Sequence, residues 1–565
     1  MTRRGLLSTL PGITLALFLA PVVAGLIGTW LPAFGYFPSL GGDHFGLQAW
    51  AALFDQPGLG SSIRLTLISG ILATLIAFLI TVFFLAACHG GRVILAVRGL
   101  MAPLIAVPHA AVALGLAFLI APSGWLVRLV SPWATGWDLP PDVATVQDPN
   151  ALALTLGLVM KELPFLMLMT LAALEQTRAD ERLAVARSLG YGPVVAWLKA
   201  VLPAVYRQIR LPIYAVLAFS LSVVDMALIL APLSPPPLAV QVLRWFNDPD
   251  LSMRFVAAAG ACLQLLIVVA AIGLWRLGEV VAVLLGRAWI AGGRRGGDGR
   301  IVRALAGGLL QAIVVLAAAG LIAMALWSVT WRWPYPDAWP AAVSLKTWAR
   351  QAPDVLSITG TTLATGLIAA AIALALVLGC LENEQRRGLT LSNRALWLLY
   401  APLLVPQVAF LFGTQVLAIQ IGIDATWIAL VWSHLLFVLP YVFLTLADPY
   451  RALDERYART AFCLGAKPNR VFWQVKLPML LRPVLFALAV GFAVSVTQYL
   501  PTLFAGGGRF VTLTTEAVGL SAGGDRRVMG VFAFLQALLP LIAFAAALAL
   551  PKPLGRRRAP LEQPA

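Results

Sequence analysis

Apolar residues run along this chain in long blocks that short polar stretches interrupt. A helix that crosses the roughly 30 Å hydrocarbon core of a membrane needs about 20 apolar residues, and the blocks have about this length or more. We count about twelve candidate spans, six in each half, at residues 6–31, 62–88, 100–121, 151–176, 209–232, 255–285, 302–328, 356–382, 395–418, 425–447, 481–500 and 528–550. The pattern predicts an all-α polytopic membrane protein.

Two of the polar stretches repeat one pattern. Gly190 and Pro203 are 13 positions apart, as are Gly465 and Pro478, and each Pro follows a Leu. Glycine adopts positive φ at little cost, so it permits a tight turn between two short helices. Proline disturbs a helix interior, so we expect Pro203 and Pro478 to interrupt the helix just before the next span.

Two further correspondences follow the same order in both halves of the chain. Pro108 and Gly115 are seven positions apart, as are Pro406 and Gly413, and a Leu-Pro pair precedes each repeated polar stretch. Such self-similarity indicates an internal duplication. Six spans lie between the two polar stretches, so the repeats are parallel rather than inverted. We predict a first half at 1–286, a basic, glycine-rich, flexible cytoplasmic linker at 287–303 and a second half at 304–565.

Composition supports the membrane assignment, and the distribution of charge predicts the topology. Hydrophobic residues make up 60% of the chain and charged residues only 12%, far from soluble averages. With the N-terminus inside, the segments on the cytoplasmic side hold most of the arginines and lysines, including those of the linker and of both repeated stretches. The net charge of +16 is therefore the positive-inside signal of a polytopic protein rather than a nucleic-acid surface. Both termini are expected in the cytoplasm.

The repeated polar stretch resembles the "EAA" loop of permease subunits from type I ABC importers. Two copies in one chain resemble the fused permeases of the iron(III)/thiamine transport group, the YnjC type in particular. The resemblance implies the MetI-like permease fold, with EAA-like loops at 177–208 and 450–480. It implies ATPase-coupling roles for Ala184, Ala186, Gly190 and Pro203 in the first loop, and for Arg459, Ala461, Gly465 and Pro478 in the second. The chain departs from the family consensus at Ala184 and Arg459, where the family has Glu.

The resemblance also implies partners: a homodimeric ABC ATPase under the membrane and a periplasmic solute-binding protein above it. No lysine of this chain follows a glycine, so the chain has no Walker A motif. ATP and Mg²⁺ are therefore expected on the ATPase, and this chain is expected to be a translocation subunit rather than an enzyme, with no cofactor of its own. Its four Cys and four His residues show no metal-ligand spacing.

A few polar side chains fall within the predicted spans, where they are costly and often functional. They are Lys161, Glu162, Asp225, His434 and Gln498. We consider them candidates for a translocation pathway. The alternative is that they form structural hydrogen bonds between helices.

These observations favour a permease in the bacterial inner membrane that moves a small solute into the cytoplasm by alternating access. The alternative is a secondary transporter driven by an ion gradient, in which the repeated stretches are interfacial amphipathic connectors. Such a transporter needs no partner and leaves the matched spacing unexplained. The sequence does not select among iron(III), thiamine, a sulfur oxyanion, a phosphonate or a polyamine as the solute.

Overall fold

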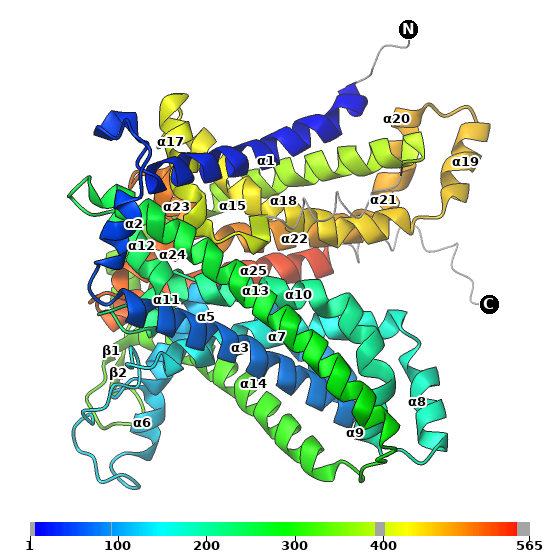
Figure 1. Cartoon of the computed structure of the whole chain (residues 1–565), viewed down its shortest axis with the longest axis horizontal. Helices are drawn as coiled ribbons and strands as arrows, with labels where there is room; N and C mark the ends of the chain where they lie inside the picture. Colours follow the sequence, from blue (N-terminus) through cyan, green and yellow to red (C-terminus); the bar gives the residue numbers. More distant parts are fainter. Residues whose placement is uncertain (1–5, 92, 390–401, 551–565) are drawn as a thin grey trace.

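The computed structural model describes residues 6–91, 93–389 and 402–550 as a long bundle of α-helices (Figure 1). The first half of the chain forms α1 (Leu6–Ala33), η1 (Pro38–Leu40), α2 (Gln48–Phe54), α3 (Leu59–Cys88), α4 (Val93–Ala106), α5 (His109–Ile120), α6 (Trp125–Val130), α7 (Leu152–Gln176), α8 (Ala179–Ser188), α9 (Pro193–Ala196), the π-helical turn η2 (Trp197–Val201), α10 (Leu202–Ser222), α11 (Asp225–Leu230), α12 (Leu238–Phe246) and α13 (Met253–Ala291).

The second half repeats the order of the first half's long helices and EAA-like loop, and it alone has a β hairpin within the described residues. It forms α14 (Arg300–Val329), strands β1 (Thr330–Arg332) and β2 (Ala342–Val343), α15 (Lys346–Arg387), η3 (Gln407–Ala409), α17 (Leu411–Gln420), α18 (Trp427–Arg451), α19 (Glu455–Cys463), α20 (Pro468–Val471), the π-helical turn η4 (Phe472–Lys476), α21 (Leu477–Met479), α22 (Leu481–Val496), α23 (Leu500–Gly506), α24 (Leu513–Leu520) and α25 (Arg526–Ala549). The antiparallel hairpin pairs Thr330 with Val343 and Arg332 with Ala342.

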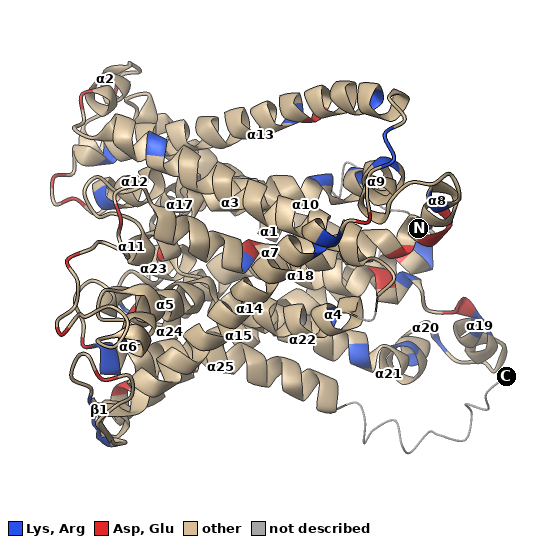
Figure 2. Cartoon of the chain, turned by 90° about the horizontal axis from the view of Figure 1, so that it is seen from below, with Lys and Arg blue, Asp and Glu red and all other residues tan. Residues whose placement is uncertain are grey.

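The two ends of the bundle differ. We call the end that holds α8 and α19 the loop end, and the end that holds α6 and the β1–β2 hairpin the hairpin end (Figure 1). Charged residues gather at both ends and are sparse between them (Figure 2), except on α7, whose Lys161 and Glu162 lie in mid-helix. This distribution is that of a protein with a hydrocarbon belt around its middle.

Within the described residues, nine helices are long and apolar enough to cross a membrane, and a tenth span results if the bent pair 468–479 and 481–496 is one span. The third span is shifted from its predicted position, 100–121, because the chain breaks between α4 and α5 and the apolar stretch continues to Val130. The predicted span 209–232 is also broken, between α10 and α11. The predicted span 395–418 lies partly outside the described residues.

The predicted linker is shorter than expected, because helices enter it from both sides. α13 continues to Ala291 and α14 begins at Arg300, so the non-helical connection consists of residues 292–299.

The first helix of each half crosses to the other half. α1 packs against α13 of its own half and against α15 and α17 of the second half, while α14 packs against α25 of its own half and against α3 and α5 of the first. Gly28 meets Gly413 at one crossing and Gly115 meets Gly320 at the other. A Cβ atom built on Gly115 would lie 3.0 Å from the carbonyl carbon of Gly320. Small residues let helix backbones approach closely in a membrane, which explains the repeated spacing of Gly115 and Gly413.

Equivalent buried glutamines lie at the breaks before α11 and α23. Gln264 of α13 donates from Nε2 to the carbonyl oxygen of Leu221, 2.9 Å away. Gln536 of α25 donates to Thr514 Oγ1 at 2.7 Å, and Thr514 donates to the carbonyl oxygen of Val496. Both glutamine side chains are fully buried. Gln264 directly, and Gln536 through Thr514, satisfy carbonyl groups that a continuous helix would pair internally.

A second duplicated hydrogen bond holds the start of the second helix after each break, α12 in the first half and α24 in the second. Thr66 Oγ1 of α3 accepts from the backbone N–H of Leu238, and Thr362 Oγ1 of α15 accepts from that of Leu513, both at 2.9 Å. The two halves therefore share individual contacts as well as element order.

At the hairpin end, a buried arginine joins the two halves. Arg128 of α6, 4% exposed, donates from Nη1 to the carbonyl oxygen of Pro334, 2.7 Å away, beside β1. Its guanidinium lies over the rings of Trp333 and Tyr335 at 5.1 and 5.4 Å. This cation–π cluster attaches the outer segment of the first half to the hairpin of the second.

The Gly413 crossing gives a direct test of the exchanged helices. A Cβ at Gly413 would lie 2.0 Å from the carbonyl oxygen of Gly25 and 2.8 Å from the backbone nitrogen of Thr29, and backbone cannot move aside cheaply. We expect Gly413→Ala to lower the free energy of unfolding in detergent by about 1–3 kcal/mol. Gly273→Ala, at an open position on α13, is the control and should leave the melting temperature unchanged or raise it. Equal melting temperatures for both variants would refute the close crossing.

Candidate EAA-like loops and polar groups of the spans

The first EAA-like loop is a helix, a turn and a second helix that continues into the next span. α8 begins with Asp180 and Glu181 in its first turn, where negative charge is favourable for a helix. His89 Nε2, which follows α3, lies 2.9 Å from Asp180 Oδ1. The chain then turns at Gly190, whose φ of +83° fits glycine. α9, η2 and α10 follow without interruption.

The second EAA-like loop has the same construction 275 positions later. Asp454 caps α19 by accepting a hydrogen bond from the backbone N–H of Arg456, 2.9 Å away. Gly465 has a φ of +79°, and α20, η4 and α21 lead to α22. The π-helical turns η2 and η4 occupy equivalent positions, directly before the repeated Leu-Pro pair.

The prolines of the two loops act differently from one another. Pro478 lies in α21 just before a 77° bend, as expected. Pro203 lies in the first turn of α10 and continues the helix, so the expected interruption is wrong for the first loop. Both prolines are the second residue of their helix and directly follow a π-helical turn, so the Leu-Pro pair alone does not decide whether the helix bends.

The other residues expected to couple to the ATPase lie on α8 and α19. Ala184 is exposed and Ala186 is buried, whereas Arg459 is exposed and Ala461 is half-buried. Arg459 Nη2 donates to Glu455 Oε2, one turn earlier, at 2.8 Å. The arginine that replaces the family's Glu therefore forms a local ion pair at the surface.

Burial differs strongly between the two loops. In the first loop, Trp197 of η2 is fully buried and Leu183 of α8 is 3% exposed. In the second loop, α19 has no buried residue, and Leu464 and Trp473 are 83% and 64% exposed within the described part of the chain. Both loops expose apolar side chains, since Val185 and Leu189 of the first are 62% and 59% exposed, but of their first helices only α8 has one face packed against the protein.

A buried ion pair attaches the second loop to the helical bundle. Lys476 of η4 donates to Glu382 Oε2 of α15 at 2.7 Å and to Gln385 Oε1 at 2.8 Å. Tyr450 of α18 also donates to Glu382, and Arg386 donates to its other oxygen at 2.6 Å. The side chains of Lys476 and Glu382 are 6% and 4% exposed. A pair this well buried needs such additional hydrogen bonds to offset its desolvation.

The first half uses a different acidic anchor. Glu279 of α13 accepts hydrogen bonds from the hydroxyl groups of Tyr206 and Tyr214 of α10, both 2.8 Å away, and pairs with Arg210 at 3.2 Å. The position equivalent to Lys476 is Val201, which is fully buried. Sequence reasoning missed Glu279 and Glu382. The available signal was a lone carboxylate inside an apolar block for Glu279 and the first carboxylate after an apolar block for Glu382, with basic residues near the repeated loops.

Lys161 caps the break between α4 and α5. Its Nζ donates to the carbonyl oxygens of Ile105 and Val107, at 2.8 and 2.6 Å. Asp225, at the start of α11, interacts electrostatically with Lys161 and with Tyr499 of the second half. Glu162 is buried beside Lys161. Three of the five polar residues predicted within the spans therefore form one group in the first half.

His434 and Gln498 form a separate group in the second half. His434 Nδ1 lies 2.7 Å from Ser495 Oγ of α22, and Nε2 lies 2.9 Å from Thr502 Oγ1 of α23. Thr502 in turn donates to the carbonyl oxygen of Gln498 at 2.8 Å. The imidazole thus connects both sides of the break between α22 and α23.

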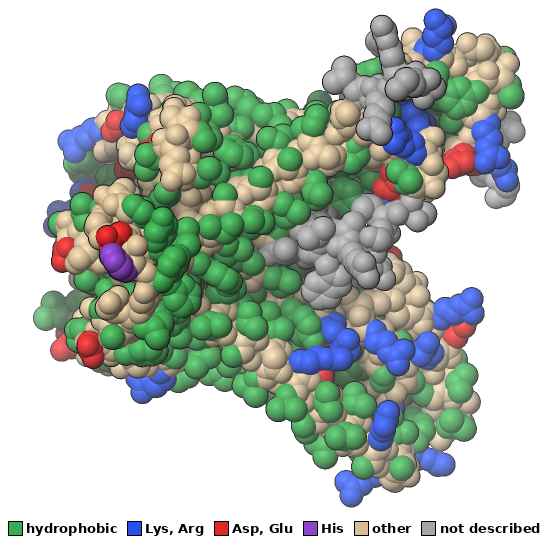
Figure 3. All heavy atoms as spheres, turned by 45° about the horizontal axis from the view of Figure 1, so that its top comes forward, with side chains coloured by type: hydrophobic (Ala, Val, Ile, Leu, Met, Phe, Trp, Pro, Cys, Tyr) green, Lys and Arg blue, Asp and Glu red, His purple; other side chains and the backbone are tan. Residues whose placement is uncertain are grey.

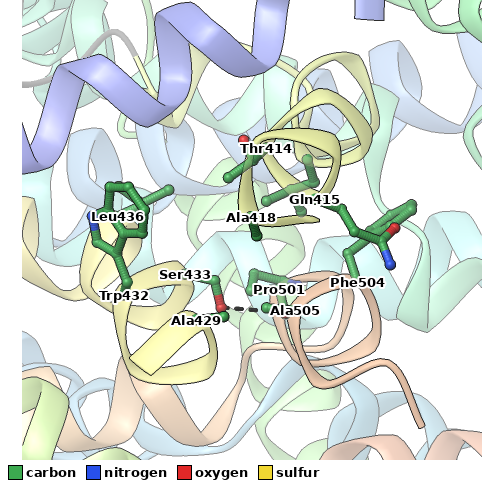
Figure 4. A pocket seen from close by; sticks show the side chains of 11 residues that line it. Thr414, Gln415, Ala418, Ala429, Trp432, Ser433, Leu436, Pro501, Phe504 and Ala505 are labelled. Atoms are coloured by element: carbon green, nitrogen blue, oxygen red, sulfur yellow. Dashed lines mark hydrogen bonds between the residues drawn. The ribbon is translucent and has the colours of Figure 1, made fainter. Parts of the chain in front are cut away.

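A small apolar cleft lies beside this group, between α17, α18 and α23 (Figure 4). Ser433 projects toward it and donates to the carbonyl oxygen of Pro501 at 3.2 Å. The lining includes no ionisable side chain. Within the described residues, no group of three His, Cys, Asp or Glu side chains is arranged to hold a metal ion.

Comparison with known proteins places this architecture in a family. The family model described as "Binding-protein-dependent transport system inner membrane component" matches residues 371–550, which include the second EAA-like loop. The molybdenum transport system permease protein ModB of Mycobacterium tuberculosis is 32% identical over 214 residues, 35% of this chain and 78% of ModB. The putrescine transport system permease protein PotI of Escherichia coli is 27% identical over 128 residues, 22% of this chain and 46% of PotI.

Another similar protein covers both halves. The inner membrane ABC transporter permease protein YnjC of Escherichia coli is 34% identical over 504 residues, 88% of this chain and 89% of YnjC. The match includes both loops and both sets of spans, so it is not confined to one repeat. The chain therefore belongs to the family of inner-membrane permeases of binding-protein-dependent ABC transporters.

Proposed function

We propose that this permease forms both halves of the translocation pathway of an ATP-driven importer, and that its two EAA-like loops couple it to a separate ATPase. One observation carries the proposal: two copies of a helix–turn–helix element, each turning at a glycine with positive φ, lie at the same end of the molecule. They stand on two arms that project separately at the loop end (Figure 3). Two similar loops suit a homodimeric ATPase that provides one docking site for each.

The arms support an alternating-access mechanism. Away from the loop end, Phe246 of α12 stacks on Phe412 of α17 with ring centroids 4.2 Å apart, and Phe504 of α23 contacts Phe246 edge-on. Aromatic contacts thus hold the halves together while the loops lie on separate arms. We infer that ATP-driven closure of the ATPase draws the loops together, that the arms rock, and that the aromatic contacts separate to admit solute from the other side.

The remaining assignments follow from this arrangement. We place both termini and the linker in the cytoplasm with the loops, and the solute-binding protein at the hairpin end. ATP and Mg²⁺ are assigned to the ATPase, and choice of solute to the binding protein. Lys161 and His434 use their polar atoms to hold breaks in the spans. We retain Glu162, Asp225 and Gln498 as pathway candidates, because Asp225 and Gln498 lie at breaks and Glu162 lies beside one.

The turn glycines test the coupling role. Valine at a φ of about +80° is strained, so Gly190→Val and Gly465→Val should displace the helices on either side of each turn. We expect both variants to insert into the membrane, to lose transport and ATPase stimulation, and to differ in severity because the loops differ in burial. Gly278→Val, at an open position on α13, is the control.

The measurement is solute uptake and ATP hydrolysis by the purified permease–ATPase complex in liposomes, together with the permease alone. The permease alone should hydrolyse no ATP. Unimpaired transport by both variants, or transport by the permease without its partner, would favour the secondary-transporter alternative.

The Lys476–Glu382 pair predicts how the second loop transmits movement. Lys476→Met removes the buried cation 2.7 Å from Glu382 and leaves Arg386 as its remaining ion partner. Breaking a buried pair from one side costs about 3–5 kcal/mol. We expect lower stability and fewer solute molecules moved per ATP hydrolysed. The double variant Lys476→Met/Glu382→Gln should regain much of the stability but not the coupling ratio. Lys346→Met, at an exposed position outside both loops, is the control and should keep the parent's coupling ratio. A normal ratio in the double variant would show that the pair is only structural.

The topology is tested by single cysteines in a chain whose four natural cysteines are replaced. Leu464→Cys, in the second loop, should resist a membrane-impermeant maleimide in intact cells and react in inverted vesicles. Trp133→Cys, which is 78% exposed just after α6, should show the opposite pattern. Labelling of the Leu464→Cys variant from outside would overturn the assigned orientation.

A further inference from the structure

The linker between the halves lies on the first EAA-like loop. The chain leaves α13 beside α9 (Figure 2), and the backbone N–H of Gly192 donates to the carbonyl oxygen of Arg295 at 2.8 Å. Lys199 Nζ of η2 donates to the carbonyl oxygens of Trp289 and Arg294, at 3.1 and 3.0 Å. The same ammonium lies 4.7 Å from the centre of the Trp289 ring. Residues 292–299 are therefore fixed on the loop by several independent contacts.

The glycines of the linker and of the loop fit this contact. A Cβ on Gly192 would lie 2.1 Å from the carbonyl oxygen of Gly297, although the φ of Gly192, −62°, would suit any residue. Gly296 and Gly299 have φ values of +71° and lie close over Val195 and Val194. These glycines permit close approach and a left-handed backbone. The glycine content of the linker, from which the sequence predicts flexibility, instead allows the linker to pack closely against the first loop.

The second loop has no equivalent cover within the described residues. The position equivalent to Gly192 is Lys467, and a Cβ on Gly465 would meet nothing within 4 Å. In the first loop, a Cβ on the equivalent Gly190 would lie 3.3 Å from Arg295 Nη1. An exposed guanidinium therefore adjoins the first turn, whereas the second turn is open.

We propose that residues 292–299 are part of the docking surface for the ATPase subunit beneath the first half, with Arg294 and Arg295 as contact residues. Both arginines are exposed, and Arg295 lies against the turn between α8 and α9. A subunit that reaches this turn meets the Arg295 guanidinium at the same time. The two docking surfaces then differ: the first includes the linker with Arg294 and Arg295, whereas the second has no such cover within the described residues and exposes the aromatic Trp473.

The chemistry of this surface specifies its partner. Guanidinium groups favour carboxylates, with which they form charge-assisted hydrogen bonds, so the docking cleft of the ATPase should include acidic residues that engage Arg294 and Arg295. Because the pairs lie at a solvent-accessible rim, their contribution should weaken as salt is raised. This inference rests on the proposed coupling role of the EAA-like loops.

Site-specific photocrosslinking separates the two hypotheses. We would introduce benzoylphenylalanine at Arg295 or at Leu464 in the full chain and irradiate the purified permease–ATPase complex. Adducts with the ATPase subunit at both positions support the inference. An adduct at position 464 without one at 295 overturns the inference and leaves the proposed function intact. No adduct at either position contradicts the coupling role itself.

Two Gly→Ala variants test whether the contact between the linker and the first EAA-like loop at Gly192 matters for docking. Gly192→Ala adds a methyl group that collides with the linker, whereas Gly297→Ala adds one to the linker where a Cβ meets nothing within 4 Å. We expect Gly192→Ala to raise about fivefold the ATPase concentration needed for half-maximal stimulation, and Gly297→Ala to leave it unchanged.

Melting temperature and salt dependence distinguish a docking role of residues 292–299 from a purely structural role. Loss of a structural role alone would lower the melting temperature without changing the salt dependence of docking. Unlike the buried crossing at Gly413, the segment that Gly192→Ala displaces is exposed and non-helical, so the expected result is weaker docking with a reduced salt dependence at an unchanged melting temperature. Arg295→Gln removes the charge but leaves the backbone contact between the linker and Gly192 in place, and it should reproduce the reduced salt dependence. Docking by Gly192→Ala and Arg295→Gln that matches the parent would overturn the inference.

Discussion

The structure depends on one constraint: a backbone carbonyl group inside a membrane must find a partner within the protein. Lipid offers no hydrogen-bond donor, so an unpaired group there costs several kcal/mol. This chain nevertheless breaks its spans between α4 and α5, α10 and α11, and α22 and α23. Lys161 occupies the first break, Gln264 the second, and Gln536 through Thr514 the third. Polar side chains in the spans are therefore needed to pair these backbone groups, whether or not they also contact the solute.

The duplication keeps the geometry of these breaks while the chemistry around them diverges. The crossings at Gly28–Gly413 and Gly115–Gly320 and the bonds from Thr66 and Thr362 recur in both halves. Contacts that fix backbone spacing tolerate few alternatives, since small residues and short side chains alone fit them. The anchors at the loop end have more freedom. One half uses Glu279 with tyrosines and the other uses Glu382 with Lys476.

Hydropathy, charge distribution and the repeated spacing were sufficient to predict the helical membrane fold, the two loops and their turn glycines. They did not predict the break at Val223–Val224, which contains neither glycine nor proline, because it depends on Gln264 from a distant helix. For the same reason, the partners of Lys161 and the buried pair of Lys476 and Glu382 could not be read from the sequence. Pro203 was misread because the same Leu-Pro pair begins an uninterrupted helix in the first half and precedes a bend in the second, and the pair alone does not decide between them.

The unequal loops change how a fused permease can work. In a permease of two identical chains, both docking surfaces are the same by symmetry. The two subunits of the ATPase dimer then make the same contacts with each loop. Here the linker lies against Gly192 in one loop, while Lys476 holds the other to α15 and α18. Fusion of the two halves allows this difference between the loops. The chain has a single linker, which joins the end of the first half to the start of the second, so it can lie on one loop but not on both. A symmetric ATPase would then transmit its closure through one loop that carries the linker and through another that is attached to the bundle by a buried ion pair.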